Sequence, residues 1–456
     1  MSDRSELFRR AAEIAAAFRA SAADRPVGRS PDLQGLRAGL HVELPERRSE
    51  PVEVLEALAK AADPGLVATV GPRYFGFVVG GALDAATAAD MVAAGWDQNG
   101  FSPALSPAAM VAEEAAGTWL KELLGLPATA SVGFATGTQQ ANTILLAAAR
   151  QQVLADRRWD VGENGLRGAP PVRVLAGTER HATIDRSLRL LGIGTTAVEE
   201  VPTDGNGAVQ EAEMLERLRS NPSVATIVCL QAGNVNTGAI DPMRRICEAA
   251  KAAKTWVHVD GAFGLWAGAS PQLKHLVDGV ELADSWSCDG HKWLNVPYDS
   301  GYAFCAHPQI HSNAVGYNAA YLVGAGGATL GDLVLDSSRR ARGFSTWAAI
   351  QELGRFGIAD MIERSCALAR RFAATLGEGG AEIHNEVVLN QVLVGFGSDA
   401  RTEAVIKGVQ EEGTCWLGGT TWRGKRLIRI SVSNWSTTEE DVDRSASAIL
   451  QVARTL

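Results

Sequence analysis

Between residues 105 and 305 the chain alternates helix-length amphipathic segments with short apolar runs, and no other feature constrains its fold as strongly. The helical segments include 108–124 and 139–154. The apolar runs are 172–176, 197–201, 225–231, 256–259 and 301–305. Short buried-looking strands separated by helices are typical of a largely parallel sheet covered on both faces. We therefore predict an α/β fold whose ligand lies at the carboxyl ends of the strands.

The segments that flank this region predict the remaining domain organisation. Residues 1–62 contain two amphipathic helical stretches, 7–23 and 53–62, which cannot bury their apolar faces alone, so we expect an N-terminal arm that packs on a partner subunit. Residues 63–320 are expected to form the large domain. Residues 321–340 are rich in glycine and are interpreted as a mobile loop beside the active site.

Residues 341–456 are predicted to form a smaller α+β domain. It begins with a long helix over 346–376, interrupted near Gly354 and Gly357. Strands then alternate with helices, and the expected ranges are 387–396 and 426–431 for the strands and 402–412 and 439–452 for the helices.

Bulk composition excludes several classes of function. A formal charge of −9 without a basic run argues against a nucleic-acid partner. No stretch of ~20 apolar residues predicts a membrane span, and the first residues lack the layout of a secretory signal. The six cysteines have no close pairs, which is typical of reduced thiols in the cytoplasm.

Lys292 stands out among the eight lysines. It follows an apolar run, and its apolar neighbours in the sequence are Trp286 before it and Trp293 and Leu294 after it. Most other lysines have polar neighbours on predicted helices. An amine in apolar surroundings is available for imine formation with a carbonyl group. A lysine whose stem lies along apolar surface at a sheet edge would give the same pattern.

Asp260 ends the strand 256–260 and is followed by Gly261 and Ala262. A carboxylate at a strand end can keep a pyridine nitrogen protonated, although such residues often serve only as turns or caps. Because Asp260 and Lys292 are expected at the same edge of one sheet, the pair indicates a site.

Two further motifs follow predicted strands. Thr136, Gly137 and Thr138 lead from an apolar strand into a helix, whose first N–H groups would hold a phosphate. His181 follows the strand 172–176 and could stack on a flat heteroaromatic ring, or simply start a helix. Because side chains alternate along a strand, His258 is expected to point into the sheet, and we interpret it as a core residue.

Together these motifs resemble the group II pyridoxal-phosphate-dependent amino acid decarboxylases, the family of aromatic L-amino acid and glutamate decarboxylases. The resemblance extends from about Pro72 to the C-terminus. Its motifs are Ala283-Asp-Ser285 before His291-Lys292-Trp293, His258-Val-Asp260-Gly-Ala262, Gly137-Thr-Gln-Gln-Ala-Asn142 and Arg429-Ile-Ser-Val-Ser-Asn434. It implies a pyridoxal-phosphate-dependent transferase fold of the aspartate aminotransferase-like type (fold type I). Such a fold has a large domain with a mixed, mostly parallel sheet and a small C-terminal α+β domain.

The resemblance also implies a role for each matching residue. Lys292 would hold pyridoxal 5′-phosphate (PLP) as a Schiff base, Asp260 would pair with the pyridine nitrogen, and His181 and Ala262 would flank the two ring faces. Gly137, Thr138, Gln139 and His291 would contact the phosphate. Tyr321 would protonate the substrate carbon, commonly in the neighbouring subunit's site, so a homodimer is implied. No metal site is expected.

Some positions depart from the family pattern. Thr138 and Gln139 stand where the family usually has Gly and Thr or Ser. Asp289 lies near the expected phosphate, where an anion is unfavourable unless it is turned away or paired. Either Asn234 or Asn236 would contact the ring hydroxyl or the substrate, and Asn236 is taken as the cofactor contact.

The predicted activity is decarboxylation of an L-amino acid to an amine and CO2. Phe75, Phe77 and Phe101 fall where the family builds its side-chain pocket, which favours an aromatic or apolar substrate, although Arg73 could instead receive an acidic one. Alternatives on the same fold are an aminotransferase, a carbon–carbon lyase or an aldehyde-forming decarboxylase. A more distant alternative is a non-catalytic binding protein on a degenerate fold.

Overall fold

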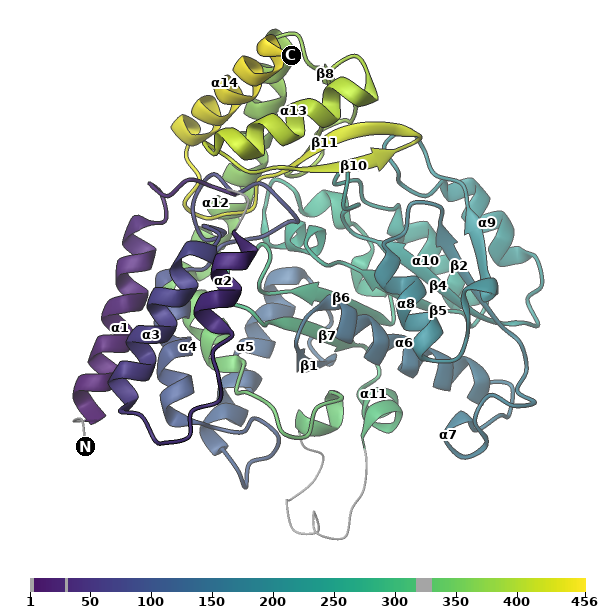
Figure 1. Ribbon diagram of the computed structural model, residues 1–456. Helices are drawn as coiled ribbons and strands as arrows, with labels where there is room; N and C mark the ends of the chain where they lie inside the picture. Colours follow the sequence, from purple (N-terminus) through teal and green to yellow (C-terminus); the bar gives the residue numbers. More distant parts are fainter. Residues whose placement is uncertain (1–3, 29–31, 317–329) are drawn as a thin grey trace.

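The computed structural model of the chain describes residues 4–28, 32–316 and 330–456, and a seven-stranded sheet forms the centre of its large domain (Figure 1). The strand order is β1-β7-β6-β5-β4-β2-β3. The strands are β1 (Ser131–Ala135), β2 (Val172–Gly177), β3 (Val198–Val201), β4 (Ala225–Gln231), β5 (Trp256–Asp260), β6 (Ser285–Asp289) and β7 (Gly301–Cys305). Strand β7 runs antiparallel to both of its neighbours, whereas β6, β5, β4, β2 and β3 pair in parallel. The predicted mixed, mostly parallel sheet is confirmed.

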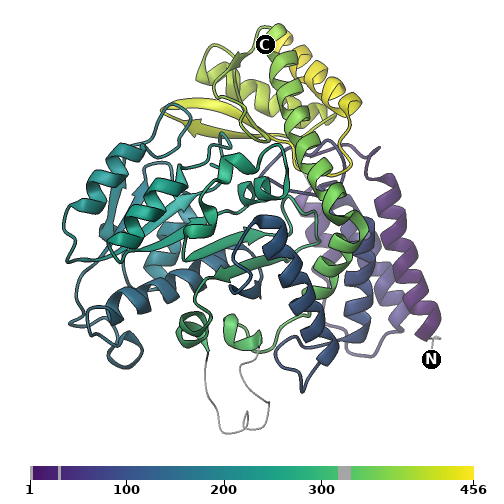
Figure 2. The same cartoon turned by 180° about the vertical axis from the view of Figure 1, so that it is seen from behind.

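Helices cover both faces of this sheet (Figures 1 and 2). One face packs against α6 (Thr138–Ala155) and α8 (Ala182–Leu190), with α11 (Pro308–Val315) beside α6. The other face packs against α5 (Pro107–Leu124), α9 (Glu211–Arg219), α10 (Met243–Ala252) and the first half of α12 (Gly343–Glu378). Two hydrophobic layers therefore enclose the strands, as the apolar runs of the sequence predict.

Side chains of β5 alternate between these two layers. Val257 and Val259 enter the core on the α5 and α10 side. His258 and Asp260 point to the opposite face, where both hydrogen-bond Asn142 of α6. His258 is fully buried, so its interpretation as a core residue is confirmed.

The small domain contains a four-stranded antiparallel sheet in the order β10-β11-β9-β8. Its elements are β8 (Glu382–Ile383), β9 (Gln391–Gly395), α13 (Asp399–Glu412), β10 (Gly418–Trp422), β11 (Lys425–Ser431) and α14 (Glu439–Thr455). Helix α12 joins the two domains, and Gly354 inside it has a non-helical backbone (φ 58°, ψ −179°), where the sequence predicted an interruption. Gly357, by contrast, stays helical.

The N-terminal segment forms α1 (Arg4–Ser21), α2 (Leu33–Leu40) and α3 (Pro51–Ala62). Helix α2 lies in the connection between the two predicted helical stretches, where no helix was predicted; Asp32 caps it by accepting hydrogen bonds from two backbone N–H groups. None of these three helices contains a buried residue in the described single chain. Their apolar side chains are therefore available to another surface.

Two further α-helices belong to the large domain. Helix α4 (Asp84–Trp96) packs against α12, and α7 (Val161–Asn164) follows α6. No helix in the described ranges combines the length and hydropathy that crossing a bilayer requires.

The segment after residue 329 is anchored by a buried ion pair. Residues 321–329 of the expected loop lie outside the described part of the chain, and a 3-10 helix follows at Leu330–Leu333. Arg339 then makes two hydrogen bonds to the Glu113 carboxylate, at 2.6 and 2.7 Å, and both side chains are almost completely buried. This pair ties the approach to α12 to helix α5.

Candidate active site

A cavity of about 330 Å³ opens at the carboxyl ends of the parallel strands. Its walls come from the ends of β4, β5 and β6 and from the residues after β1 and β2. The lining residues are Thr136, Gly137, Thr138, Gln139, His181, Thr183, Gln231, Gly233, Val235, Asp260, Ala262, Phe263, Asp289, His291 and Lys292. Of the predicted catalytic and cofactor residues in the described ranges, all but Asn236 line this cavity.

Lys292 follows β6 in a tight turn and reaches back into the cavity. The Gly290 and His291 N–H groups donate to the Ser300 carbonyl and close this turn, and the Gly80 backbone lies against Lys292 so closely that a Cβ at Gly80 would overlap its carbonyl. Only 21% of the Lys292 side chain is exposed. Its Nζ lies 3.0 Å from Oδ2 of Asp289, so the amine is paired inside the protein rather than solvated.

Asp260 is fixed by a chain of buried hydrogen bonds. Asn142 donates from Nδ2 to Asp260 Oδ2 (3.2 Å), while its Oδ1 accepts from Ser287 (2.6 Å) and from His258 Nε2 (2.9 Å). Because an amide oxygen only accepts, His258 carries its proton on Nε2. Burial lowers the pKa of His258 to about 3, so the imidazole stays neutral. The chain presents one carboxylate oxygen of Asp260 in a fixed orientation.

The turn before α6 forms the opposite wall. The Thr138 N–H at the helix start donates to Asp289 Oδ1 at 2.6 Å. The Thr138 hydroxyl is buried and has no hydrogen-bond partner among the residues that the structure describes. A Cβ at Gly137 would come within 2.9 Å of the His291 ring, which explains the need for glycine. A helix N-terminus at the wall of a cavity, with a buried unpaired hydroxyl at its first residue, is suited to a phosphate.

His181 caps α8 and lines the same cavity. Its Nδ1 lies 2.9 Å from the Thr183 hydroxyl, which is also within 3.5 Å of Asp260. Burial lowers the pKa of His181, and the nearby Lys292 and Arg429 charges add to this effect while Asp260 opposes it. Thr183 was not predicted from the sequence as a site residue, although its hydroxyl contacts both His181 and Asp260.

Asp289 combines burial with a retained charge. Only 2% of its side chain is exposed. Burial alone would raise the pKa of Asp289, but Lys292, His291 and the Thr138 hydrogen bond outweigh it, so the pKa is lowered. The predicted anion near the phosphate turn is therefore paired.

The remaining predicted contacts lie elsewhere. Asn236 accepts a hydrogen bond from Thr420, and Asn234 donates to the Glu179 carbonyl. Neither asparagine lines the cavity. Tyr321 lies outside the described residues.

The three predicted pocket phenylalanines also lie outside the cavity walls. Phe75 packs on Phe372 in the small-domain core, and Phe101 is buried. Phe77 is 64% exposed and stacks on Trp416. Arg73, considered as a receiver of acidic substrates, is buried and bonds Asp441 and the Thr414 carbonyl, so this role is excluded.

Arg429 of β11 faces the large domain. Its neighbours Ile428 and Ile430 enter the small-domain core, so alternation turns Arg429 to the other side, where its charge acts on His181. Burial lowers the pKa of Arg429. Within the described ranges, no carboxylate pairs with this guanidinium and no oxygen accepts its hydrogen bonds.

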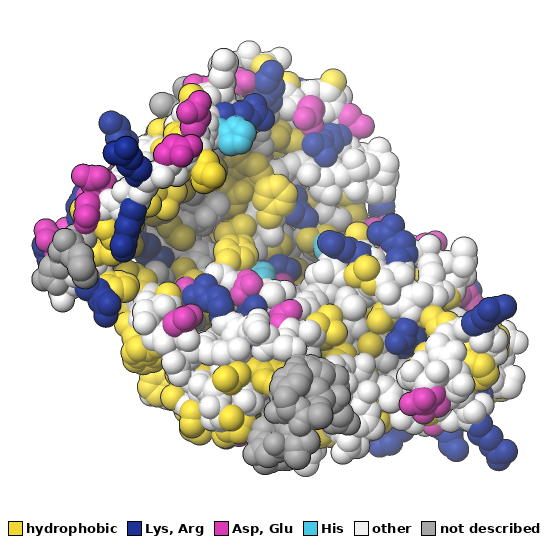
Figure 3. Space-filling view, turned by 60° about the horizontal axis from the view of Figure 1, so that its bottom comes forward, with side chains coloured by type: hydrophobic (Ala, Val, Ile, Leu, Met, Phe, Trp, Pro, Cys, Tyr) yellow, Lys and Arg dark blue, Asp and Glu magenta, His cyan; other side chains and the backbone are white. Residues whose placement is uncertain are grey.

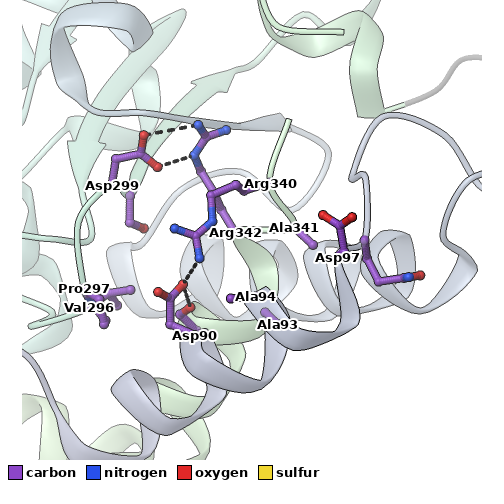
Figure 4. Close-up of a pocket in the computed structure, with 13 residues that line it drawn as sticks. Asp90, Ala93, Ala94, Asp97, Val296, Pro297, Asp299, Arg340, Ala341 and Arg342 are labelled. Atoms are coloured by element: carbon purple, nitrogen blue, oxygen red, sulfur yellow. Dashed lines mark hydrogen bonds and ion pairs between the residues drawn. The ribbon is translucent and has the colours of Figure 1, made fainter. Parts of the chain in front are cut away.

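A second, polar cavity of about 60 Å³ lies between α4, residues 296–300 and the start of α12 (Figure 4). Arg342 pairs with Asp299 and Arg340 pairs with Asp90 across it. Within the described ranges, each of these four charged side chains is therefore paired with one of opposite charge. The ion pair between Arg342 and Asp299 links the start of α12 to the residue before Ser300. The Ser300 N–H in turn donates to His291 Nδ1.

The first cavity therefore defines a strand-end site with a lysine, a carboxylate and an anion-binding helix start. The family model of the pyridoxal-dependent decarboxylase conserved domain matches residues 34–396. The chain belongs to this family, and PLP is the family's cofactor.

Known relatives agree with this assignment. Tryptophan decarboxylase 1 of Oryza sativa subsp. japonica is 27% identical over 90% of this chain and 86% of its own. The 4-hydroxyphenylacetaldehyde synthase of Rhodiola rosea is 26% identical over 86% of this chain and 83% of its own. The solved structure of Oryza sativa TDC with PLP and tryptamine superposes with a TM-score of 0.91 at 23% identity, covering 99% of this chain and 97% of the other. The predicted fold class is thus confirmed, and the enzyme is a PLP-dependent amino acid decarboxylase.

The residues in the cavity fit this cofactor. The unpaired Thr138 hydroxyl and the start of α6 suit its phosphate, Asp260 suits a protonated ring nitrogen, and Lys292 supplies the only amine of a lysine side chain among the lining residues.

Proposed function

We propose that this enzyme decarboxylates an aromatic or apolar L-amino acid to its amine, with Lys292, Asp260 and the start of α6 holding the cofactor. The observation that carries the proposal is the convergence of these three groups on one cavity. When bound, PLP withdraws electrons from the bond between the α-carbon and the carboxyl group of the attached amino acid.

The chain's own residues then have distinct tasks. Lys292 would hold the cofactor through its aldehyde and would leave that position to the substrate amine. Asp260, held by Asn142, keeps a proton on the pyridine nitrogen. His181 and Ala262 confine the ring, and Thr138, Gln139 and His291 bind the phosphate. Tyr321 would supply the proton that the α-carbon takes up in place of the carboxyl group.

The preference for an aromatic or apolar substrate has three supports. Val235 and Phe263 contribute apolar surface to the cavity. Arg73 is occupied by Asp441, so it leaves no receiver for an acidic side chain at that position. One relative is named for tryptophan and another for a phenol-bearing aldehyde.

The direct test is a product assay. Purified enzyme loaded with PLP is incubated with each of the twenty amino acids, and CO2, amine, aldehyde and ammonia are measured. We expect CO2 and amine in equal amounts from an aromatic amino acid. An aldehyde with ammonia, as the synthase relative suggests, or a keto acid would reject the proposed product.

Arg429 is proposed to orient the substrate carboxylate, because it is a partly buried cation without a partner in the described ranges and lies near His181. A charged hydrogen bond contributes about 1.5–3 kcal/mol. Arg429→Gln should therefore raise KM about tenfold to a hundredfold, with a smaller change in kcat. Steady-state kinetics measure both parameters.

The matched control is Arg426→Gln on the same strand. Arg426 pairs with Glu403 of α13, within the small domain, so its loss should leave KM unchanged. Equal KM values for Arg429→Gln and the unmodified enzyme would remove Arg429 from substrate binding.

We further propose a homodimer in the cytoplasm. Helices α1 to α3 expose apolar side chains, including Phe8, Leu40 and Leu58. Figure 3 shows a hollow lined by hydrophobic side chains with charged groups on its rim. Burying such surface on a second copy would stabilise both chains. Sedimentation equilibrium that gives a single-chain mass at micromolar concentration would exclude the dimer.

All six cysteines are free and buried, which supports a reducing compartment.

A further inference from the structure

Asp289 stands where the proposed function needs a phosphate to bind. Its Oδ1 accepts a hydrogen bond from Thr138 at the start of α6, at 2.6 Å. The same carboxylate lies 3.0 Å from Lys292 Nζ and 3.7 Å from His291 Nε2. The Asp289 carboxylate is thus an anion of the chain itself, and it already interacts with the start of α6, with Lys292 and with His291.

A bound phosphate monoester would require these same groups. Its second pKa is about 6, so it is a dianion near neutral pH. Two anions at one helix start repel each other strongly, because a site with little water screens their charges poorly. Lys292, the nearest cation to Asp289, is also the residue that the proposed function removes from this pairing by binding the cofactor aldehyde.

We propose that Asp289 competes with the cofactor phosphate for the start of α6, and that binding of the phosphate is coupled to uptake of one proton by the Asp289 carboxyl group. A protonated Asp289 becomes a donor to a phosphate oxygen instead of a second anion. This inference rests on the proposed phosphate site, and goes beyond it by assigning a regulatory role to one residue.

The surroundings of Asp289 decide the sign of the pH dependence. Titratable groups whose charge interacts with it come from its own strand, the following residues, β7 and the cap of α8, namely Cys288, His291, Lys292, Tyr298, Tyr302 and His181. Asp260, at the end of β5, lines the same cavity. In the free protein the pKa of Asp289 is lowered, so the carboxylate is ionised at neutral pH. A phosphate dianion beside it raises this pKa. The complex then carries one more proton than its separate parts, so affinity falls as pH rises between the two pKa values.

The test uses pyridoxamine 5′-phosphate, which carries the phosphate but cannot form an imine with Lys292. Binding to the apoenzyme is measured by calorimetry at pH 8 in two buffers with different ionisation enthalpies. We expect uptake of about one proton by the unmodified protein and of none by Asp289→Asn. Asn keeps the size of the side chain and can still accept from the Thr138 N–H. It should bind the probe at least about tenfold more tightly.

Two controls separate this effect from general changes in charge. Pyridoxamine, which lacks the phosphate, should bind both proteins equally. Asp284→Asn removes a carboxylate just before the opposite end of β6, where Asp284 accepts from the Val257 N–H, and should leave the dissociation constant of the phosphate probe unchanged.

Each remaining outcome is decisive. Equal or weaker binding of the phosphate probe by Asp289→Asn overturns the inference, as does proton uptake that persists in this variant. If the variant does not fold, absence of proton uptake by the unmodified protein still overturns it, and uptake of about one proton supports it. An unmodified protein that binds neither PLP nor the probe rejects the proposed function itself, a result distinct from the others.

Discussion

Lys292→Ala should lower kcat at least about 10⁴-fold, in the range seen when a covalent catalytic group is removed. Lys292 is the only lysine that lines the cavity among the described residues, so no second amine can take its place at the cofactor aldehyde. The variant should also lose the visible absorbance of the lysine Schiff base while still binding PLP through Asp260 and the start of α6. Stopped-flow kinetics and absorbance spectra measure the two effects separately.

Two further variants sharpen this test. Lys292→Arg keeps a cation beside Asp289 but cannot form the Schiff base, so it should be as inactive as Lys292→Ala. Lys274→Ala changes an exposed lysine and should be indistinguishable from the unmodified enzyme. Borohydride reduction of the loaded enzyme followed by peptide mapping should place the pyridoxyl group on Lys292. Its appearance on another lysine would refute the assignment.

Much of this site could be predicted from the sequence because its residues follow strands. Parallel strands end at one edge, so Asp260, His181 and Lys292 had to converge once the strand pattern was identified. In the structure all three line one cavity. The apolar runs also identified β2, β3, β4, β5 and β7, because a strand buried in the middle of such a sheet needs a nearly continuous apolar sequence.

Contacts that depend on side-chain direction could not be predicted in the same way. Asn142 is part of a recognised motif, but its role between His258 and Asp260 emerges only when α6 lies across β5. The Asp289 pairing likewise depends on how a turn brings Lys292 back over its own strand. Helix α2 was missed because its eight residues are too few for a periodic signal, and its Asp32 cap lies in a polar stretch that also suits a loop.

Asp260→Asn should lower kcat about 10³-fold, comparable with the loss of a preorganised group that stabilises developing charge. The substitution keeps the shape of the side chain but removes the charge that holds a proton on the pyridine nitrogen. Lys292 and the start of α6 are unaffected, so the Schiff-base absorbance should remain.

This combination distinguishes Asp260 from Lys292, whose loss abolishes both activity and absorbance. The ¹⁵N chemical shift of labelled PLP reports directly on protonation of the ring nitrogen, and it should move from the protonated to the neutral range in Asp260→Asn. Asp185→Asn is the matched control, because Asp185 lies on α8 and its charge is directed to Arg180 rather than into the cavity. An unchanged shift together with unchanged kcat in Asp260→Asn would show that the carboxylate at the end of β5 has no part in the chemistry.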